Sequence, residues 1–165
     1  MSDLLMQRKA DISACGRYRY SLQRIWGEAP PLAFIMLNPS TADANIDDPT
    51  IRRCMSFARR EGCGGIIVVN LFALRATDPK ELLKSIDPVG PYNILVINSI
   101  IDAPTPPRIV CAWGAHALAL AQARKAIDFA HSFRRQLWCL GRTRLKFAPR
   151  HPLYVDGDQP LEVFP

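Results

Sequence analysis

The sequence lacks the features of several large classes of protein. No apolar run approaches the roughly 20 residues that a membrane-spanning helix needs, and the first residues include Asp3 and no apolar core of a signal peptide. The five cysteines are odd in number and no two have C-x-x-C spacing, which argues against a disulfide framework, a zinc knuckle and an iron–sulfur site. We therefore expect a cytoplasmic protein with free thiols and no membrane partner.

Sequence motifs for a bound cofactor, a hydrolase triad and a metal site are also missing. There is no Gly-rich loop of the phosphate-binding type and no Ser, His and Asp in the order of a hydrolase triad. The three histidines, His116, His131 and His151, are far apart in the sequence, which argues against a metal site. We expect neither a cofactor nor a metal, and we interpret His116 and His131 as surface or packing residues of helices.

The composition is that of an ordinary globular domain. Of the 165 residues, 48% are apolar and 22% are charged, and this length allows one sizeable core. The chain contains no repeat, low-complexity tract or linker, and the proline-rich stretch 104–107 is interpreted as a rigid loop. Residues 1–165 are therefore predicted to form a single α/β domain.

Four short apolar runs, each bounded by turn-forming residues, predict strands that are buried on both faces of a parallel sheet. They cover residues 32–37, 66–69, 109–113 and 137–140. Helical segments lie between them: Asp48 and Asp78 each precede a proline as N-caps, a third helix opens at Gly90, and the Ala-rich stretch 115–130 predicts a long helix. This alternation predicts the α/β class, as a three-layer α/β/α sandwich around a central, mainly parallel four-stranded sheet.

Two further segments are candidates for additional strands. Residues 17–26 alternate polar and apolar side chains, which indicates an extra strand or a hairpin at the edge of the sheet. The tail, residues 160–165, is a candidate for another short strand.

Polar residues follow the predicted parallel strands. Asn38 comes directly after the first, Asn70 after the second, and His151 after the fourth and a basic loop, while the third ends in Trp113. Because ligands bind beyond the carboxyl ends of strands in open parallel sheets, we expect Asn38, Asn70 and His151 to meet in one cleft. Each also has a structural explanation, since Asn is common in turns and at strand ends, and Trp113 is expected to pack.

Three aspartates follow Asn38 within ten residues. We interpret Asp43, Asp47 and Asp48 as turn and cap residues, and Asp48 only as the N-cap of the helix that Pro49 begins. Asp43 alone is retained as a candidate for orienting a water molecule.

One segment contains basic residues and no acidic ones. Between Phe129 and Val155 there is no Asp or Glu, although the net charge of the whole chain is only +6. Such a run is often a solvated face, but here it surrounds His151, which favours contact with phosphates. The predicted nucleic-acid contacts are Arg142, Arg144, Lys146 and Arg150.

The order of these motifs resembles that of the uracil-DNA glycosylase superfamily. There the first strand ends in a motif such as G-Q-D-P-Y or G-I-N-P-G, and Leu37-Asn38-Pro39-Ser40 looks like the Asn-Pro form. Val68-Val69-Asn70 resembles the L-L-N at the end of a second strand, and Trp113-Gly114-Ala115 the W-G motif of a third. His151-Pro152-Leu153 partly matches the final H-P-S-P. The resemblance implies the fold of that superfamily for the predicted sandwich.

The resemblance also implies roles in base excision. Asn38 would position a water through its side-chain carbonyl, Asn70 would bond a flipped base as donor and acceptor, and His151 would donate a hydrogen bond to the leaving base. Leu153 or Tyr154 would act as a wedge near the duplex. Asn38, His151 and Asp43 are thus the predicted catalytic residues, and the predicted substrate contacts are Asn70, Pro39, Ser40, Leu153 and Tyr154.

The sequence departs from that superfamily in three places. An amide such as Asn38 cannot act as a general base, so hydrolysis would be slow. Leu37 replaces the glycine of the first motif, and Leu153-Tyr154 replaces the second Ser-Pro of the last. The aromatic side chain that would stack on the base is not assigned, and the candidates are Phe34, Tyr20 and Phe72.

A closer resemblance covers five segments of the sequence, which together look like a bacterial family catalogued as domain of unknown function 1643. The segments are LNPSTAD, DPTIRR, NLFALRATDP, WG and HPLY.

We consider three functions for the chain, and for the first two we expect DNA or a ligand containing a nucleobase as partner. The first is a glycosylase-like enzyme acting on a base in DNA. The second is a non-catalytic binder of nucleic acid or nucleotide in the same cleft, and the third is an enzyme for a small substrate unrelated to nucleic acids.

Overall fold

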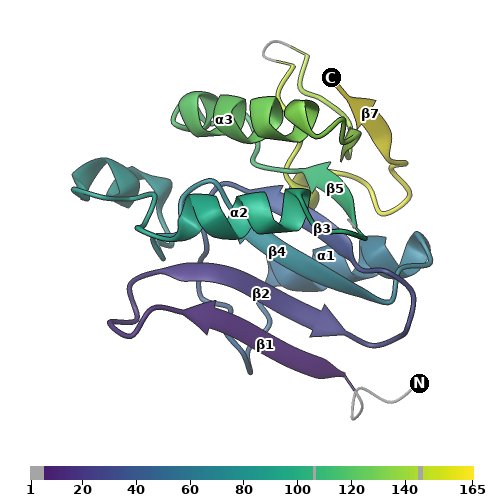
Figure 1. Cartoon of the computed structure of the whole chain (residues 1–165), viewed down its shortest axis with the longest axis horizontal. Helices are drawn as coiled ribbons and strands as arrows, with labels where there is room; N and C mark the ends of the chain where they lie inside the picture. Colours follow the sequence, from purple (N-terminus) through teal and green to yellow (C-terminus); the bar gives the residue numbers. More distant parts are fainter. Residues whose placement is uncertain (1–5, 106, 145–146) are drawn as a thin grey trace.

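A seven-stranded sheet runs through the computed structural model, which describes residues 6–105, 107–144 and 147–165 (Figure 1). The strand order across the sheet is β1-β2-β4-β3-β5-β6-β7. The strands are β1 (Gln7–Ile12), β2 (Arg19–Ile25), β3 (Leu32–Met36), β4 (Gly65–Asn70), β5 (Arg108–Cys111), β6 (Leu137–Cys139) and β7 (Glu162–Phe164). The helices are α1 (Pro49–Arg60), α2 (Asn93–Ile101) and α3 (Ala119–Ser132), with the 3₁₀ helices η2 (Pro79–Lys84) and η3 (Pro152–Tyr154).

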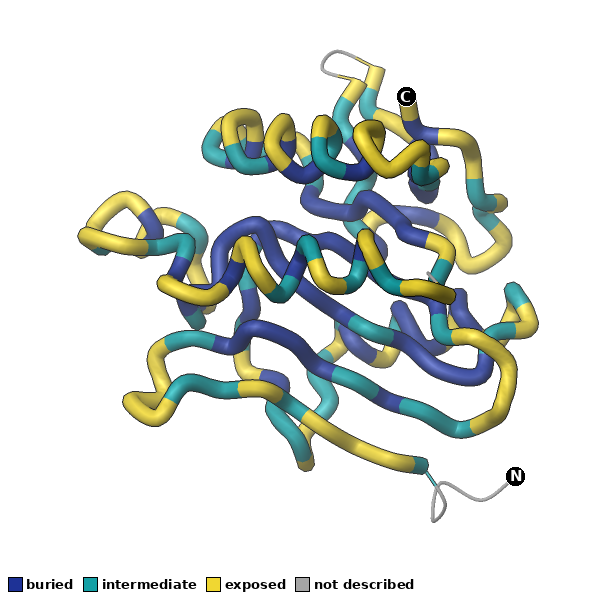
Figure 2. Tube along the Cα trace, in the orientation of Figure 1, coloured by how far each residue is buried: buried dark blue, intermediate teal, exposed yellow. Residues whose placement is uncertain are grey.

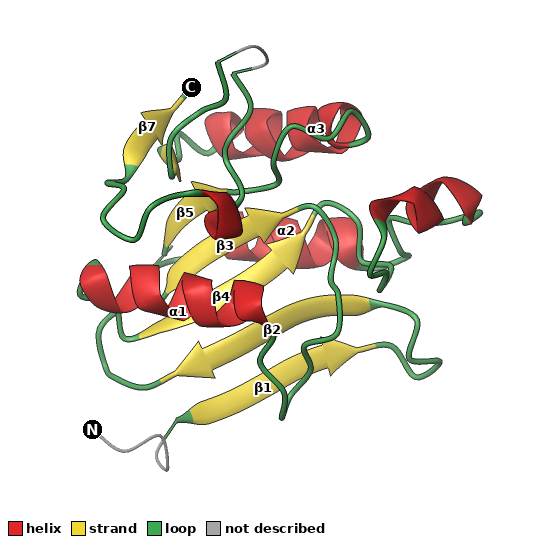
Figure 3. Cartoon of the chain, turned by 180° about the vertical axis from the view of Figure 1, so that it is seen from behind, coloured by secondary structure: helices red, strands yellow, loops and turns green. Residues whose placement is uncertain are grey.

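The four apolar runs form the parallel centre of this sheet, as predicted. β3 pairs in parallel with both β4 and β5, and β5 pairs in parallel with β6. Every residue of β3 is buried, because α1 covers one face of the sheet while α2 and α3 cover the other (Figures 1, 2 and 3). The continuous apolar runs follow from this burial on both faces.

The prediction of a four-stranded sheet was wrong, because antiparallel strands extend the parallel centre on both sides. β2 pairs with β4 and β1 pairs with β2, so the segment 17–26 lies inside the sheet and not at its edge. On the other side β7 pairs with β6, which confirms the predicted strand in the tail. No strand was predicted for β1, because most of its side chains are exposed and it therefore carries little apolar patterning.

The predicted capping signals start two of the helical segments. The Asp48 carboxylate accepts a hydrogen bond from the Ile51 backbone N–H at the start of α1, and Asp78 caps η2 in the same way. The segment after Asp78 forms a 3₁₀ helix, and α2 begins a few residues after Gly90. The Ala-rich helix α3 begins at Ala119 and not at residue 115, so the residues just after β5 form a loop.

The topology makes an opening at one end of the parallel strands. The chain leaves β3 toward β4 on one side, and then crosses through α2 to β5 on the other side of β3. At such a switch point the connecting segments diverge, which leaves a crevice beyond the carboxyl ends of the strands. Among the described residues, no helix is long and apolar enough to cross a membrane.

Candidate functional site

A cavity of about 520 Å³ opens beyond the carboxyl ends of the parallel strands. Its walls come from the loops after β3, β4, β5 and β6, together with the start of α1. The structure therefore brings most of the predicted site residues to one place, although they are spread over more than 110 positions of the sequence. The predicted residues that line the cavity are Asn38, Ser40, Asn70, Arg150, His151, Leu153 and Tyr154.

The structure does not bring every predicted residue into this cavity. Pro39 is buried beside it, with a carbonyl that accepts from the Asn38 side chain at 3.1 Å. Asp43 points into its own turn, where one carboxylate oxygen accepts from the backbone N–H groups of Asn45 and Ile46, and these bonds lower the pKa of Asp43. Because this carboxylate is held in the turn and does not line the cavity, it does not meet Asn38 there.

The Asn38 side chain is oriented by two backbone carbonyls. Its Nδ2 donates to the Ala76 carbonyl oxygen at 2.8 Å and to the Pro39 carbonyl oxygen at 3.1 Å. Within the described residues, its Oδ1 has no hydrogen-bond partner. The polar atom that Asn38 leaves open is therefore an acceptor, as required for holding a water molecule.

Asn70 ends β4 and is almost completely buried, with 1% of its surface exposed. Its side-chain Nδ2 is buried and has no hydrogen-bond partner among the described residues. A buried donor without a hydrogen-bond partner destabilises the folded protein by about 1–3 kcal/mol. Such a group is therefore expected to bind an acceptor in the functional complex. Because Asn70 lines the cavity, a ligand in the cavity is positioned to supply that acceptor.

His151 presents a donor to the same cavity. Its Nδ1 accepts from the Leu153 backbone N–H at 3.2 Å, so the neutral imidazole carries its proton on Nε2. Burial lowers the pKa of His151, which keeps the ring neutral at neutral pH. Gly114, whose φ is 77°, forms the turn beside His151. A Cβ atom at position 114 would lie 3.9 Å from the Cβ of His151.

Three residues of the cavity wall were missed by the sequence analysis. His116 was placed on a helix by the sequence analysis, which was wrong, because it lies in the loop before α3, where it lines the cavity. Asp48, interpreted only as an N-cap, also lines the cavity while it caps α1. Within the described chain it supplies the single carboxylate among the lining residues.

The third missed residue is Arg19, the first residue of β2. Its exposed fraction is 2%, and burial lowers the pKa of Arg19 to about 10, so it remains a cation at neutral pH. Its Nη1 donates to the Ala42 carbonyl oxygen at 2.8 Å, whereas its Nε is buried without a partner in the described chain. The cavity wall therefore contains a buried cation, Arg19. The sequence analysis had considered this residue only as part of the alternating segment 17–26.

The aromatic candidates for base stacking do not line the cavity. Phe34 and Phe72 are core residues, and Tyr20 packs between Tyr18 and Tyr92. The aromatic side chains in the wall are Trp113, which packs edge-on against Phe164 with ring centroids 5.7 Å apart, and Tyr154. Tyr154 is 74% exposed at the mouth, and its ring centroid lies 5.5 Å from that of His151.

The basic segment divides into separate surfaces. Arg135 is structural, because it donates to the carbonyl oxygens of Ile101 and Ala103. Arg142 and Arg144 are exposed and line a shallow depression beside the cavity, and Arg150 lines both. Lys146 lies outside the described residues. The predicted contact of these residues with nucleic acid stays a prediction.

Comparisons with known proteins place the chain in a family without assigning an activity. Within the described parts of the chain, no group of three or more His, Cys, Asp or Glu side chains is arranged to hold a metal ion. A search of curated proteins and a search of solved structures each gave no match. A family model described as a protein of unknown function, DUF1643, matches residues 19–153, which contain every lining residue of the cavity except Tyr154. The chain belongs to the DUF1643 family.

Proposed function

We propose that this protein binds a nucleobase in the cavity and hydrolyses the N-glycosidic bond that joins the base to the sugar of DNA. The observation that carries the proposal is the meeting of Asn38, Asn70 and His151 in one cavity, where the Asn70 Nδ2 is buried and has no hydrogen-bond partner among the described residues. The order of these three residues along the chain resembles that in the uracil-DNA glycosylase superfamily. Parallel strands with helices on both faces are compatible with the three-layer fold of that superfamily.

The chemistry of base release requires three groups, and the cavity wall has a candidate for each. The leaving base gains negative charge, which the Nε2–H of a neutral His151 would stabilise as a hydrogen-bond donor. The Asn70 amide would bond the edge of the base, and the Asn38 carbonyl would hold the attacking water. Leu153 and Tyr154, both exposed at the mouth, would contact the nucleic acid from which the base is extruded.

Asp48 is a candidate for the proton acceptor that the reaction needs and that Asn38 cannot be. The side chain of Asn38 can orient water but cannot accept its proton at neutral pH. The Asp48 carboxylate lines the same cavity, and only one of its oxygens is hydrogen-bonded to the Ile51 N–H within the described chain. In the proposed reaction Asp48 takes up the proton that the water loses, while Asn38 fixes the direction of attack.

The test is release of free base from single- and double-stranded oligonucleotides that carry uracil or other altered bases. Asn38→Ala and His151→Ala should each reduce release by about 10²-fold or more, the range for removing one positioned donor or orienting group. Asp48→Asn should do the same while it preserves the cap of α1, since Asn is also a good N-cap. The matched controls are Asn45→Ala, His131→Ala and Asp43→Asn, which change the same residue types outside the cavity.

Two results would contradict the proposal. One is the absence of release from every substrate in a broad panel. The other is release that the changes at Asn38 and His151 leave at the wild-type rate, since an unrelated surface or a contaminant would then be responsible.

A second function is non-catalytic binding of nucleic acid or a nucleotide in the same cavity. The observation that favours it is the Asn38 side chain, an amide held by two carbonyls at the position where water activation is needed. Binding without turnover would support this function. A steep decrease of affinity with salt would indicate DNA, because phosphate contacts release counterions, and weak salt dependence would indicate a small ligand.

A further inference from the structure

Arg19 is a buried cation with an unused hydrogen-bonding edge. A guanidinium has five N–H donors, and a buried one is normally paired with carboxylates or carbonyls because its desolvation costs several kcal/mol. Within the described residues, the Arg19 side chain makes a single hydrogen bond, from Nη1 to the Ala42 carbonyl oxygen. Its Nε is buried and unpartnered, and its Nη2 donates to no described group. These two nitrogens form the edge that binds two oxygens of one anion.

A bulge in β2 directs this side chain to the cavity. Along β1 the pairing passes from Asp11 with Ser21 to Ile12 with Arg19, so Tyr20 is an extra residue in β2. Such a bulge breaks the alternation of side chains and re-aims the residue beside it. Tyr20 consequently packs against Tyr92, which precedes α2, whereas Arg19 bonds Ala42 in the loop before α1 and lines the cavity.

In the part of the chain that the structure describes, no acidic side chain neutralises Arg19 by direct contact. The carboxylate that acts on it most strongly is that of Asp48, which raises its pKa through space but forms no ion pair with it. Asp48 is instead hydrogen-bonded at the N-terminus of α1. The unused edge of Arg19 is therefore open to an anion that enters the cavity.

We propose that Arg19 is an oxyanion subsite of the cavity, and that the natural ligand carries a phosphate that accepts hydrogen bonds from its Nε and Nη2. The proposal rests on the proposed function for the remainder of the ligand, which would be a base and sugar placed at Asn70 and Asn38. The phosphate has two sources, the terminal group of a nucleoside monophosphate or a phosphodiester next to an extruded nucleotide. Because only 2% of Arg19 is exposed, either one must reach it through the cavity.

The experiment compares matched ligands with and without phosphate. Binding of the four common deoxynucleoside monophosphates plus dUMP, of the corresponding nucleosides, of inorganic phosphate and of a uracil-containing single strand is measured by calorimetry. The proteins are the wild type, Arg19→Met and the control Arg124→Met, which changes an exposed arginine of α3 outside the cavity and outside the predicted nucleic-acid contacts. Arg19→Met replaces the cation by an unbranched apolar side chain of similar volume, so the fold is expected to persist.

We expect the wild type to bind at least one ligand that contains phosphate about 10- to 100-fold more tightly than its phosphate-free counterpart, the range for charge-assisted hydrogen bonds. Arg19→Met should lose that preference, and Arg124→Met should keep it. A preference confined to monophosphates identifies a terminal phosphate, and one confined to the oligonucleotide identifies a phosphodiester. The Nε–H signal of Arg19 in an NMR spectrum should move when phosphate is added.

The two proposals fail separately in this experiment. If nucleosides bind but phosphate adds nothing, or if Arg19→Met keeps the preference for phosphate, the oxyanion subsite is wrong and the nucleobase proposal stands. If inorganic phosphate shifts the Arg19 signal while no nucleoside, nucleotide or oligonucleotide binds better than phosphate alone, the subsite stands and the nucleobase proposal is wrong. If no phosphate compound moves the Arg19 signal, the subsite is wrong.

Discussion

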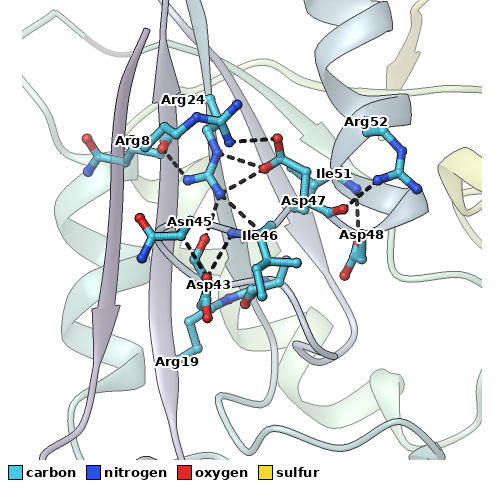
Figure 4. Close-up of polar contacts among 12 residues, drawn as sticks. Arg8, Arg19, Arg24, Asp43, Asn45, Ile46, Asp47, Asp48, Ile51 and Arg52 are labelled. Atoms are coloured by element: carbon cyan, nitrogen blue, oxygen red, sulfur yellow. Dashed lines mark hydrogen bonds and ion pairs between the residues drawn. The ribbon is translucent and has the colours of Figure 1, made fainter. Parts of the chain in front are cut away.

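Arg19 and Arg24 lie five positions apart in β2, are both buried, and have opposite surroundings. Arg24 is fully enclosed: its Nε donates to Asp47 at 2.8 Å, its Nη1 to the Gln23 carbonyl, and its Nη2 to the carbonyl of Asp43 at 2.6 Å (Figure 4). The Nε and Nη2 of Arg24 both contact the Asp47 carboxylate. In Arg19 the same edge has no partner in the described chain.

The difference separates a structural cation from one that faces a ligand site. Asp47 also binds Arg8 of β1, so Arg24 and Asp47 tie the loop before α1 to the antiparallel side of the sheet. Arg19 contacts that loop through one carbonyl only and otherwise faces the cavity. The same residue type in one strand therefore stabilises the fold in one case and is available for binding in the other.

Replacement of Arg24 should have the largest effect on stability. Arg24→Met removes the donor to the Gln23 and Asp43 carbonyls and leaves Asp47 paired with Arg8. Because Arg8 still pairs with Asp47, the loss should lie at the lower end of the range of about 3–5 kcal/mol that is typical when one partner of a buried ion pair is removed. Urea denaturation followed by circular dichroism measures the free energy of unfolding. A loss below about 1 kcal/mol would show that the loop does not depend on Arg24 and would remove the contrast with Arg19.

The same substitution at Arg19 should leave stability nearly unchanged. Arg19→Met removes one hydrogen bond and also removes the desolvation cost of a buried cation, so the free energy of unfolding should stay within about 1 kcal/mol of the wild type. The free energies of unfolding of Arg19→Met and Arg24→Met are compared in urea under the same conditions. The two variants carry the same substitution and differ only in its position along β2. A loss at Arg19 as large as that at Arg24 would mean that Arg19 too is a structural cation, which would weaken its assignment to the cavity.

The smallest expected effect concerns the pH dependence of stability through His151. Burial lowers the pKa of this imidazole in the folded protein, whereas in the unfolded chain it titrates near the ordinary value of about 6.5. Between that value and the lower folded pKa the unfolded state binds more protons, so stability should decrease as the pH falls below about 6.5. His151→Gln should flatten this slope in urea denaturation between pH 8 and 5, and His131→Gln on the exposed end of α3 should not. Equal slopes for wild type and His151→Gln would contradict the burial of a neutral ring.

Much of the fold could be predicted because local signals were strong. The four apolar runs became the parallel strands, and Asp48-Pro49 caps and starts α1. The end of β4 carries Asn70 and the loops after β3 and β6 carry Asn38 and His151, and these three residues lie at one edge because parallel strands end on the same side of a sheet. β1 gave no comparable signal, since it is an exposed strand held by pairing with β2.

The missing parts of the site depended on contacts that no local pattern reports. Alternation in the segment 17–26 suggested a strand or hairpin at the edge of the sheet, but the extra residue Tyr20 turns Arg19 toward the cavity. Asp48 looked like a cap and is one, yet its position at the start of α1 also places it in the wall. Asp43 and Asp48 both follow Asn38 within ten residues and are the same residue type. Asp43 nevertheless stabilises its own turn and does not line the cavity.

The sequence alone determined the parallel centre, the start of α1 and the edge where polar residues gather, because periodicity, capping and strand direction are local or topological properties. The tertiary structure decided which charged groups face that edge. Arg24 meets Asp47 in the loop before α1, whereas Arg19 meets no carboxylate of the described residues. This difference arises from a register shift between β1 and β2 and from the path of that loop. Whether a buried charge is satisfied depends on atoms that are distant in the chain, and only the folded arrangement brings them together or leaves them apart.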